Sequence, residues 1–237
     1  MKNNIQINSP LGDGGYRQYP AISNSDLTEF RDFIFGIKRF KPVNAFGSAF
    51  HEVLLEPKAP HIFPESVDKD QILHLSNKVR ENKFCKWALQ FSRKEQGFLF
   101  DDVQTNLPCK AKIDMVLSQN LIVDFKTTSQ RSEAAFLKSC LEYEYDRQAA
   151  FYLDAVSTSR RSLSEAEGRK IMKFIFVGVQ KKAPYDLYIF DTSKDAAFIE
   201  QGRKKYKALL RRWKEMGGVP NAFVPSTWNI ELLNQAA

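Results

Sequence analysis

The sequence predicts a mixed fold of the α/β or α+β class, and three observations support this prediction. Residues 23–94 contain apolar positions at helical spacing. Residues 97–128 then resemble three short strands separated by polar breaks. Two further helical patterns, at 132–157 and 193–216, flank another pair of strand-like runs. This order of helices, three strands, helix, two strands and helix indicates a sheet covered by helices.

The helices of the first third have recognisable start and stop signals. Ser23 or Ser25 can cap a helix whose apolar stripe extends to Ile37. The next helical pattern, "NAFGSAFHEVLLEP", is stopped by Pro57. Residues 68–94 continue with apolar positions at helical spacing. We therefore expect helices throughout this part of the chain.

The strands form a meander in the middle of the chain. The three runs are "GFLFDDVQTNL", "CKAKIDMVL" and "LIVDFKTT", and short polar breaks between them allow tight turns. A helix from about 132 to 157 follows. The runs "KIMKFIFVGVQ" and "PYDLYIFD" supply two more strands, and a helix over about 193–216 completes the domain.

Length and composition are those of one globular unit. The chain has 237 residues, and 43% of them are hydrophobic, which is enough to bury a sizeable core. We expect an irregular arm over 1–20 and a single domain over 21–237. No apolar run approaches the roughly 18 residues that span a bilayer, and the first residues lack the apolar stretch of a signal peptide. We expect a cytoplasmic protein without a membrane partner.

Three charged residues stand in the two apolar strands of "KAKIDMVLSQNLIVDFKTT". The period of two places Asp124 and Lys126 on one face of the second strand. If the turn has an odd number of residues centred on Gln119, Asp114 faces Asp124 across the hairpin. A two-residue turn would instead put the two acids on opposite faces.

Two opposed carboxylates repel each other, so their charge must be offset. A divalent cation such as Mg²⁺ or Mn²⁺ does this, because it prefers oxygen ligands from carboxylates, water and phosphate. Lys126, beside them, could hold a scissile phosphate or help to deprotonate an attacking water. The alternative is an edge hairpin with ordinary solvated charges.

The chain is basic, with a net charge of +7 and a pI near 9.2, which favours a polyanionic partner. The charge is concentrated in "GRKKYKALLRRWK", whose apolar residues fall on one helical stripe. The opposite face is either an ordinary solvated surface or a contact to the DNA backbone. The candidate DNA contacts are Lys204, Lys205, Lys207 and Arg211.

Three short motifs together resemble the PD-(D/E)XK nuclease superfamily. The first is D-x9-D-x-K, formed by Asp114, Asp124 and Lys126. "FGSAFHEVLLEP" is similar to the G-x-x-x-H helix of RecB-like and RecE-like nucleases, with Gly47 and His51 in the matching places. "DRQAAFYLDA" is similar to their Q-x-x-x-Y motif, and "ISNSDL" to the opening of RecE-type exonuclease VIII domains. The likeness covers roughly residues 20–190.

This resemblance implies a restriction-endonuclease-like core with a mixed central sheet flanked by helices. It implies that His51, Asp114 and Asp124 bind Mg²⁺ or Mn²⁺ and that Lys126 assists the nucleophile. Gln148 and Tyr152 would support the site or touch the DNA. Many members of the superfamily have Glu where this chain has Asp124, which shortens the reach of the carboxylate by one methylene.

The implied activity is that of a RecE-like, phage-type exodeoxyribonuclease. It would hydrolyse phosphodiester bonds from the ends of double-stranded DNA, from 5′ to 3′, and leave a single strand for an annealing protein in recombination. Relatives form rings around DNA, so a homo-oligomer is expected. Two alternatives are an endonuclease of the same superfamily and a non-catalytic DNA-binding module on the same fold.

The motif residues also have ordinary structural interpretations. A single histidine on a helix, such as His51, is more often a core residue than a metal ligand. Gln148 and Tyr152 could be the polar edge of an amphipathic helix. Their combination with the acids and the lysine is what favours a site.

Overall fold

The computed structural model describes residues 16, 19–38, 44–117, 120–161, 172–217, 223–226 and 228. Its centre is a five-stranded mixed sheet in the order β1-β2-β3-β4-β5. β3 and β4 run parallel, and the other neighbours are antiparallel. The strands are β1 (Arg93–Asp101), β2 (Pro108–Leu117), β3 (Leu121–Thr128), β4 (Lys173–Gln180) and β5 (Leu187–Asp191). The predicted α+β class is confirmed.

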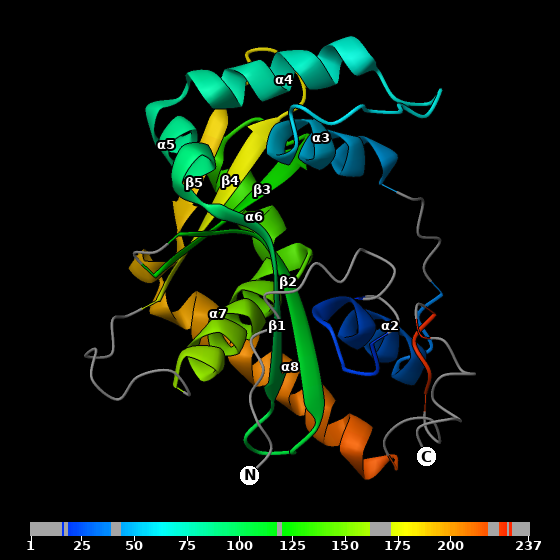
Figure 1. Cartoon of the computed structure of the whole chain (residues 1–237). Helices are drawn as coiled ribbons and strands as arrows, with labels where there is room; N and C mark the ends of the chain where they lie inside the picture. Colours follow the sequence, from blue (N-terminus) through cyan, green and yellow to red (C-terminus); the bar gives the residue numbers. More distant parts are fainter. Residues whose placement is uncertain are drawn as a thin grey trace.

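Helices cover both faces of the sheet (Figure 1). One group packs with a core cluster that includes Phe30, Phe151 and Trp213, and the other with a cluster that includes Phe50 and Leu75. The first group is α2 (Asn24–Ile34), α6 (Glu133–Glu142), α7 (Tyr145–Arg161) and α8 (Ala196–Glu215). The second group is α3 (Ala45–Leu55), α4 (Lys69–Glu81) and α5 (Lys83–Phe91).

Two segments that we expected to be continuous helices are each broken in two. Between α4 and α5, Asn82 is extended, and its side chain accepts a hydrogen bond from the backbone N–H of Cys85. Asparagine is a preferred N-cap, so it starts a new helix here. Between α6 and α7, Glu144 has a φ of 56°. Neither glycine nor proline marks that second break in the sequence.

Other boundaries differ by a few residues. Ser23 is the N-cap of α2 and forms a capping box with Asp26. α2 ends before Ile37, whose side chain is exposed. β1 begins at Arg93 and ends at Asp101, because the carboxylate of Asp102 accepts hydrogen bonds from the turn that follows.

The two faces of the sheet bury alternating residues. In β4, Phe174 and Phe176 belong to the core cluster under α7, whereas Ile175 and Val177 belong to the cluster under α3. In β3, Ile122 belongs to the α7 side and Val123 to the α3 side. The strand period therefore sends the side chains of Asp124 and Lys126 to the α7 side.

The three cysteines are free and buried, as expected from their wide spacing. Burial raises the pKa of the Cys85 and Cys140 thiols to about 12, so both are protonated at neutral pH. Among the helices described, none combines the length and the apolar character that a membrane crossing requires.

Candidate active site

The hairpin of β2 and β3 has the predicted register. Met115 pairs with Val123, Val116 with Ile122, and Leu117 with Leu121. Asp114 and Asp124 are each one position beyond the last of these pairs. From there β2 continues beside β1, with one further bridge between Cys109 and Ile22, and β3 continues beside β4. The acids therefore stand where the two central strands separate.

His51 reaches Asp114 from α3. The helix begins after Asn44, whose side chain accepts a hydrogen bond from the N–H of Gly47. One turn later, Nδ1 of His51 lies 3.1 Å from Oδ2 of Asp114. α3 packs on the opposite face of the sheet from α7. The separation of β2 from β3 lets the histidine reach the acid, so residues from both layers meet at one point.

Asp124 is held by two side chains. Nζ of Lys126 lies 3.1 Å from Oδ1 and 2.9 Å from Oδ2, and Nε2 of Gln148 donates to Oδ1 at 2.9 Å. Gln148 comes from the first turns of α7, which packs against this face. The carboxylate of Asp124 is 5% exposed, compared with 27% for Asp114. We call the group of His51, Asp114, Asp124, Lys126 and Gln148 the catalytic cup.

The charges in the catalytic cup compensate one another. Burial raises the pKa of Asp114, but the hydrogen bond and charge of His51 outweigh it and leave the pKa lowered. Burial also raises the pKa of Asp124, and Lys126 only partly opposes this. For Lys126, burial lowers the pKa, but the charges of Asp124, Tyr145 and Asp114 and the hydrogen bond with Asp124 together outweigh it, so the pKa is raised. The chain thus supplies a cationic partner for each acid, which offsets the repulsion that the sequence implied.

Tyr145 is a member of the site that sequence reasoning missed. Nζ of Lys126 lies 4.9 Å from the centre of the Tyr145 ring, which is a cation–π distance. The ring also stacks on Phe176 of β4, with centroids 5.4 Å apart. Tyr145 stands three residues before Gln148, on the same helical face. This three-residue spacing from Gln148 is the sequence feature that could have identified Tyr145 as part of the site.

Tyr152 follows Gln148 by one helical turn and faces the same region. Burial raises its pKa well above the usual value, and the charges of Tyr16, Asp114 and Asp124 add to the effect, while a hydrogen bond with Gln148 opposes it. Its hydroxyl therefore stays protonated and can hold the amide of Gln148. The structure brings together six of the motif residues: His51, Asp114, Asp124, Lys126, Gln148 and Tyr152.

The donor set suits a hard divalent cation, because it offers two carboxylates and an imidazole. Oδ2 of Asp124 is buried and, despite the nearby ammonium of Lys126, makes no hydrogen bond with a described residue. A metal ion could bind this oxygen in competition with the ammonium of Lys126. Across the described ranges, no three His, Cys, Asp or Glu side chains are already grouped around one point as metal ligands. His51 and Asp114 bind each other instead.

The basic helix α8 has the expected apolar stripe, in which Tyr206, Leu209 and Trp213 are buried. Its charged face is only partly free. Lys205 binds the fully buried Asp146 at 2.6 Å, whereas Lys204 forms an exposed pair with Glu200. Arg211 donates to Gln104 at 3.2 Å, and Lys207 lines a cavity. Lys205 thus has a structural role, and no observation here tests the predicted DNA contacts.

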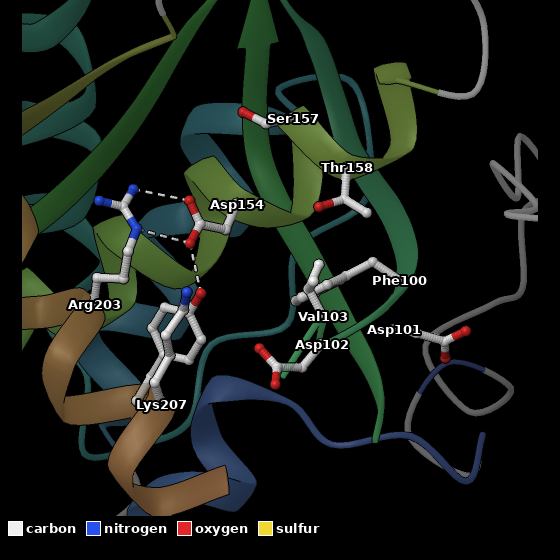
Figure 2. Close-up of a pocket in the computed structure, with 10 residues that line it drawn as sticks. Phe100, Asp101, Asp102, Val103, Asp154, Ser157, Thr158, Arg203 and Lys207 are labelled. Atoms are coloured by element: carbon white, nitrogen blue, oxygen red, sulfur yellow. Dashed lines mark hydrogen bonds and ion pairs between the residues drawn. The ribbon is translucent and has the colours of Figure 1, made fainter. Parts of the chain in front are cut away.

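A cavity of about 290 Å³ lies apart from the catalytic cup, between the end of β1, α7 and α8. Figure 2 shows Asp154 of α7 hydrogen-bonded there to Arg203 of α8. Nε and Nη2 of Arg203 each donate to the carboxylate at 2.8 Å, and the hydroxyl of Tyr206 donates to it as well. None of the catalytic cup residues lines this cavity. Its network joins α7 to α8.

The fold and the catalytic cup together are those of a PD-(D/E)XK protein. The chain belongs to the family described as "PDDEXK-like domain of unknown function (DUF3799)", whose model matches residues 65–218. The structure is also similar to the crystal structure of a "Putative exonuclease" from Eubacterium rectale. That likeness has a TM-score of 0.60 and 14% identity, over 90% of this chain and 88% of the other. A search of curated proteins found no match.

These comparisons confirm the predicted superfamily and support a nuclease. The family match includes Asp114, Asp124, Lys126, Gln148 and Tyr152, and it begins after His51. At 14% identity, the structural likeness shows the fold alone. The RecE branch remains a prediction from the motifs.

We expect replacement of Gln148 by leucine to lower cleavage about 10- to 100-fold, the usual effect of losing a partner that orients a metal ligand. The amide donates 2.9 Å from Oδ1 of Asp124, and leucine cannot replace that bond. Initial rates on a linear duplex at several Mg²⁺ concentrations measure the effect. Gln201→Leu, on the exposed face of α8, is the matched control. Equal rates for both variants would show that the amide does not orient Asp124.

Proposed function

We propose that this protein is a divalent-metal-dependent exodeoxyribonuclease that hydrolyses double-stranded DNA from its ends, from 5′ to 3′. The main support is the catalytic cup, in which two acids and a lysine of a PD-(D/E)XK motif meet a histidine and a glutamine from two different helices. The family supports a nuclease, and the motifs resemble those of the RecE type.

The residues would divide the work by position. His51, Asp114 and Asp124 would hold Mg²⁺ or Mn²⁺, which would activate water and neutralise phosphate charge. Lys126 presents its ammonium beside Asp124, where it can bind a phosphate oxygen and orient the attacking water. Gln148 keeps the carboxylate of Asp124 in place. Tyr145 shields one side of Lys126 from solvent.

An endonuclease and a non-catalytic module are less well supported. Both acids and the lysine of the motif are present, Lys126 contacts Asp124, and His51 contacts Asp114. A non-catalytic module would have no need to keep this arrangement. A sequence-specific endonuclease needs elements for target recognition, and the described part of the chain is a sheet with its flanking helices.

The test compares a linear duplex with a covalently closed circle, in Mg²⁺, Mn²⁺ or EDTA. We expect the linear duplex to be degraded in either metal and spared in EDTA, and the circle to survive. A label on one 5′ end or one 3′ end reports the polarity. Efficient cutting of the circle would favour the endonuclease, and binding without cleavage in either metal would favour the module.

We further propose that the product strand passes to an annealing protein and that the chain forms a homo-oligomer around DNA. Both proposals come from the likeness to RecE-type nucleases. Light scattering of the protein alone tests the oligomer. Co-purification with a single-strand annealing protein, with and without resected DNA, tests the partner.

We expect α8 to add sequence-independent affinity for the DNA backbone. Replacing Lys204, Lys207 and Arg211 by glutamine should flatten the slope of log affinity against log salt by about 2 to 3, because each phosphate contact contributes about 0.9. Lys205 is left in place, since it pairs with the buried Asp146. The control replaces Lys58, Lys83 and Lys86, three exposed lysines on the other layer. Equal slopes in both triple variants would make α8 an ordinary solvated face.

A further inference from the structure

The turn between α6 and α7 presents an exposed aromatic ring. Tyr143 is the C-cap of α6, and its side chain is 64% exposed. Phe136 of α6 and Phe151 of α7, by contrast, are buried. Leu141, on the same turn, is 45% exposed. A single exposed tyrosine is common on protein surfaces. A functional role for Tyr143 therefore depends on where it lies relative to the catalytic cup.

Two ring contacts connect Tyr143 to the catalytic lysine. The ring centroids of Tyr143 and Tyr145 are 5.8 Å apart, and the Tyr145 ring lies 4.9 Å from Nζ of Lys126. Tyr145 is partly buried between Lys126 and Phe176, while Tyr143 is open to solvent. Tyr143 therefore stands at the rim of the catalytic cup, within reach of a nucleotide that neighbours the scissile phosphate.

The turn that carries Tyr143 is held rigidly. Glu144 has a φ of 56°, a conformation that costs free energy in a residue with a side chain. Its carboxylate binds Arg31 of α2 and lies 3.3 Å from the buried guanidinium of Arg147. The N–H of Tyr143 donates to the carbonyl of Ser139 at 2.9 Å. A ring fixed in this way loses little conformational entropy when it binds a ligand.

The surrounding charge points to a base and not to a phosphate. Glu142 lies 3.9 Å from Lys138, and Glu144 binds Arg31 and Arg147, so these cations near Tyr143 are already paired with acids and are poor partners for a phosphate. A nucleobase is uncharged and offers a flat π face that stacks on tyrosine. Within a duplex both faces of a base are covered by its neighbours, so an open face occurs only at an end or in an unpaired strand.

We infer that Tyr143 is a positioning residue that stacks on the unpaired terminal base of the strand whose phosphate enters the catalytic cup. The inference rests on the proposed function and deepens it, because it names the part of the DNA end that the protein recognises. Stacking at the rim would hold the frayed end open and set the register of the scissile phosphate. It would also favour ends that fray easily.

The experiment measures binding and cleavage separately for wild type, Tyr143→Phe and Tyr143→Leu. Phenylalanine keeps the ring, and leucine keeps an apolar side chain without a π face. Binding is measured in EDTA, to prevent cleavage, on a duplex with a short unpaired 5′ end that carries 2-aminopurine as the terminal base. A second substrate has an abasic site in its place.

We expect Tyr143→Leu to weaken binding about 5- to 100-fold, the factor that corresponds to losing one base–aromatic stack. Tyr143→Phe should bind like wild type. Wild type should quench the fluorescence of the 2-aminopurine. Its affinity for the abasic end should be lower by the same factor, whereas Tyr143→Leu should bind both ends equally. Because Tyr143 is exposed, all three proteins should unfold at the same temperature.

Equal affinity of wild type for the intact and abasic ends would overturn the inference, even if a variant failed to fold. So would unchanged binding by Tyr143→Leu. In both cases cleavage of linear DNA by wild type would leave the proposed function standing. If wild type neither bound nor cleaved any DNA, the proposed function itself would fall, and Tyr143 would be assigned to contact with another protein.

Discussion

Asp114→Asn and Asp124→Asn should each lower cleavage of linear duplex DNA by about 10³-fold or more. Each removes a carboxylate that would hold the metal and leaves a neutral amide of the same shape. The loss should appear in kcat, and it should not be recovered by raising the DNA concentration. Initial rates in Mg²⁺ and in Mn²⁺ measure it. Near-normal turnover in either variant would show that the catalytic cup is not the active site.

The two variants should differ in stability, although they share the loss of activity. Asp114 pairs with His51, which can become neutral by releasing a proton, so Asp114→Asn should unfold near the wild-type midpoint. Asp124 pairs with Lys126, an ammonium that is 19% exposed and has Asp124 as its ion-pair partner. Asp124→Asn should therefore cost about 1–3 kcal/mol. Repulsion between opposed acids, taken alone, would instead predict a gain of stability in both variants.

A double variant separates the two effects of Asp124. Asp124→Asn with Lys126→Met removes the unpaired ammonium, so urea unfolding should return toward the wild-type free energy while activity stays lost. If the double variant were no more stable than Asp124→Asn, the pair of Asp124 and Lys126 would contribute nothing to stability.

Gly202→Ala should cause a large loss of stability in the helical layer that contains α7 and α8. A Cβ at this position would lie 1.9 Å from the backbone oxygen of Asp146 and 2.7 Å from the N atom of Arg147. These are backbone atoms of α7, so the clash cannot be relieved by rotating a side chain. We expect the free energy of unfolding to fall by about 3 kcal/mol or more. This corresponds to a fall of roughly 6–12 °C in the melting temperature.

The same substitution should also impair the catalytic cup. Asp146 and Arg147 immediately precede Gln148, which donates to Asp124, so a displaced α7 moves that donor. Gly97→Ala in β1 is the matched control, because an added Cβ there meets nothing within 4 Å. Thermal unfolding and cleavage rates are measured for both. Equal melting temperatures would mean that α7 and α8 can separate at little cost.

Several features of the site follow from local sequence. The alternation in "LIVDFKTT" is enough to put Asp124 and Lys126 on one face, because a strand reverses its side chains at every residue. Ser118 and Gln119 of the odd turn lie outside the described residues, but the pairing of Met115 with Val123 has the register that this turn implies. The four-residue spacing of Gln148 and Tyr152 likewise depends only on the helical period.

The sequence by itself therefore determined the strands, the register of the hairpin, and the shared face of Asp124 and Lys126. Only the tertiary structure decided their partners. It paired Asp114 with His51 and Asp124 with Gln148, and it turned Lys205 inward to the buried Asp146. Periodicity describes neighbours within one strand or helix, whereas these contacts join residues that are distant in the chain. They depend on how β2 separates from β3 and on how the helices pack around that opening.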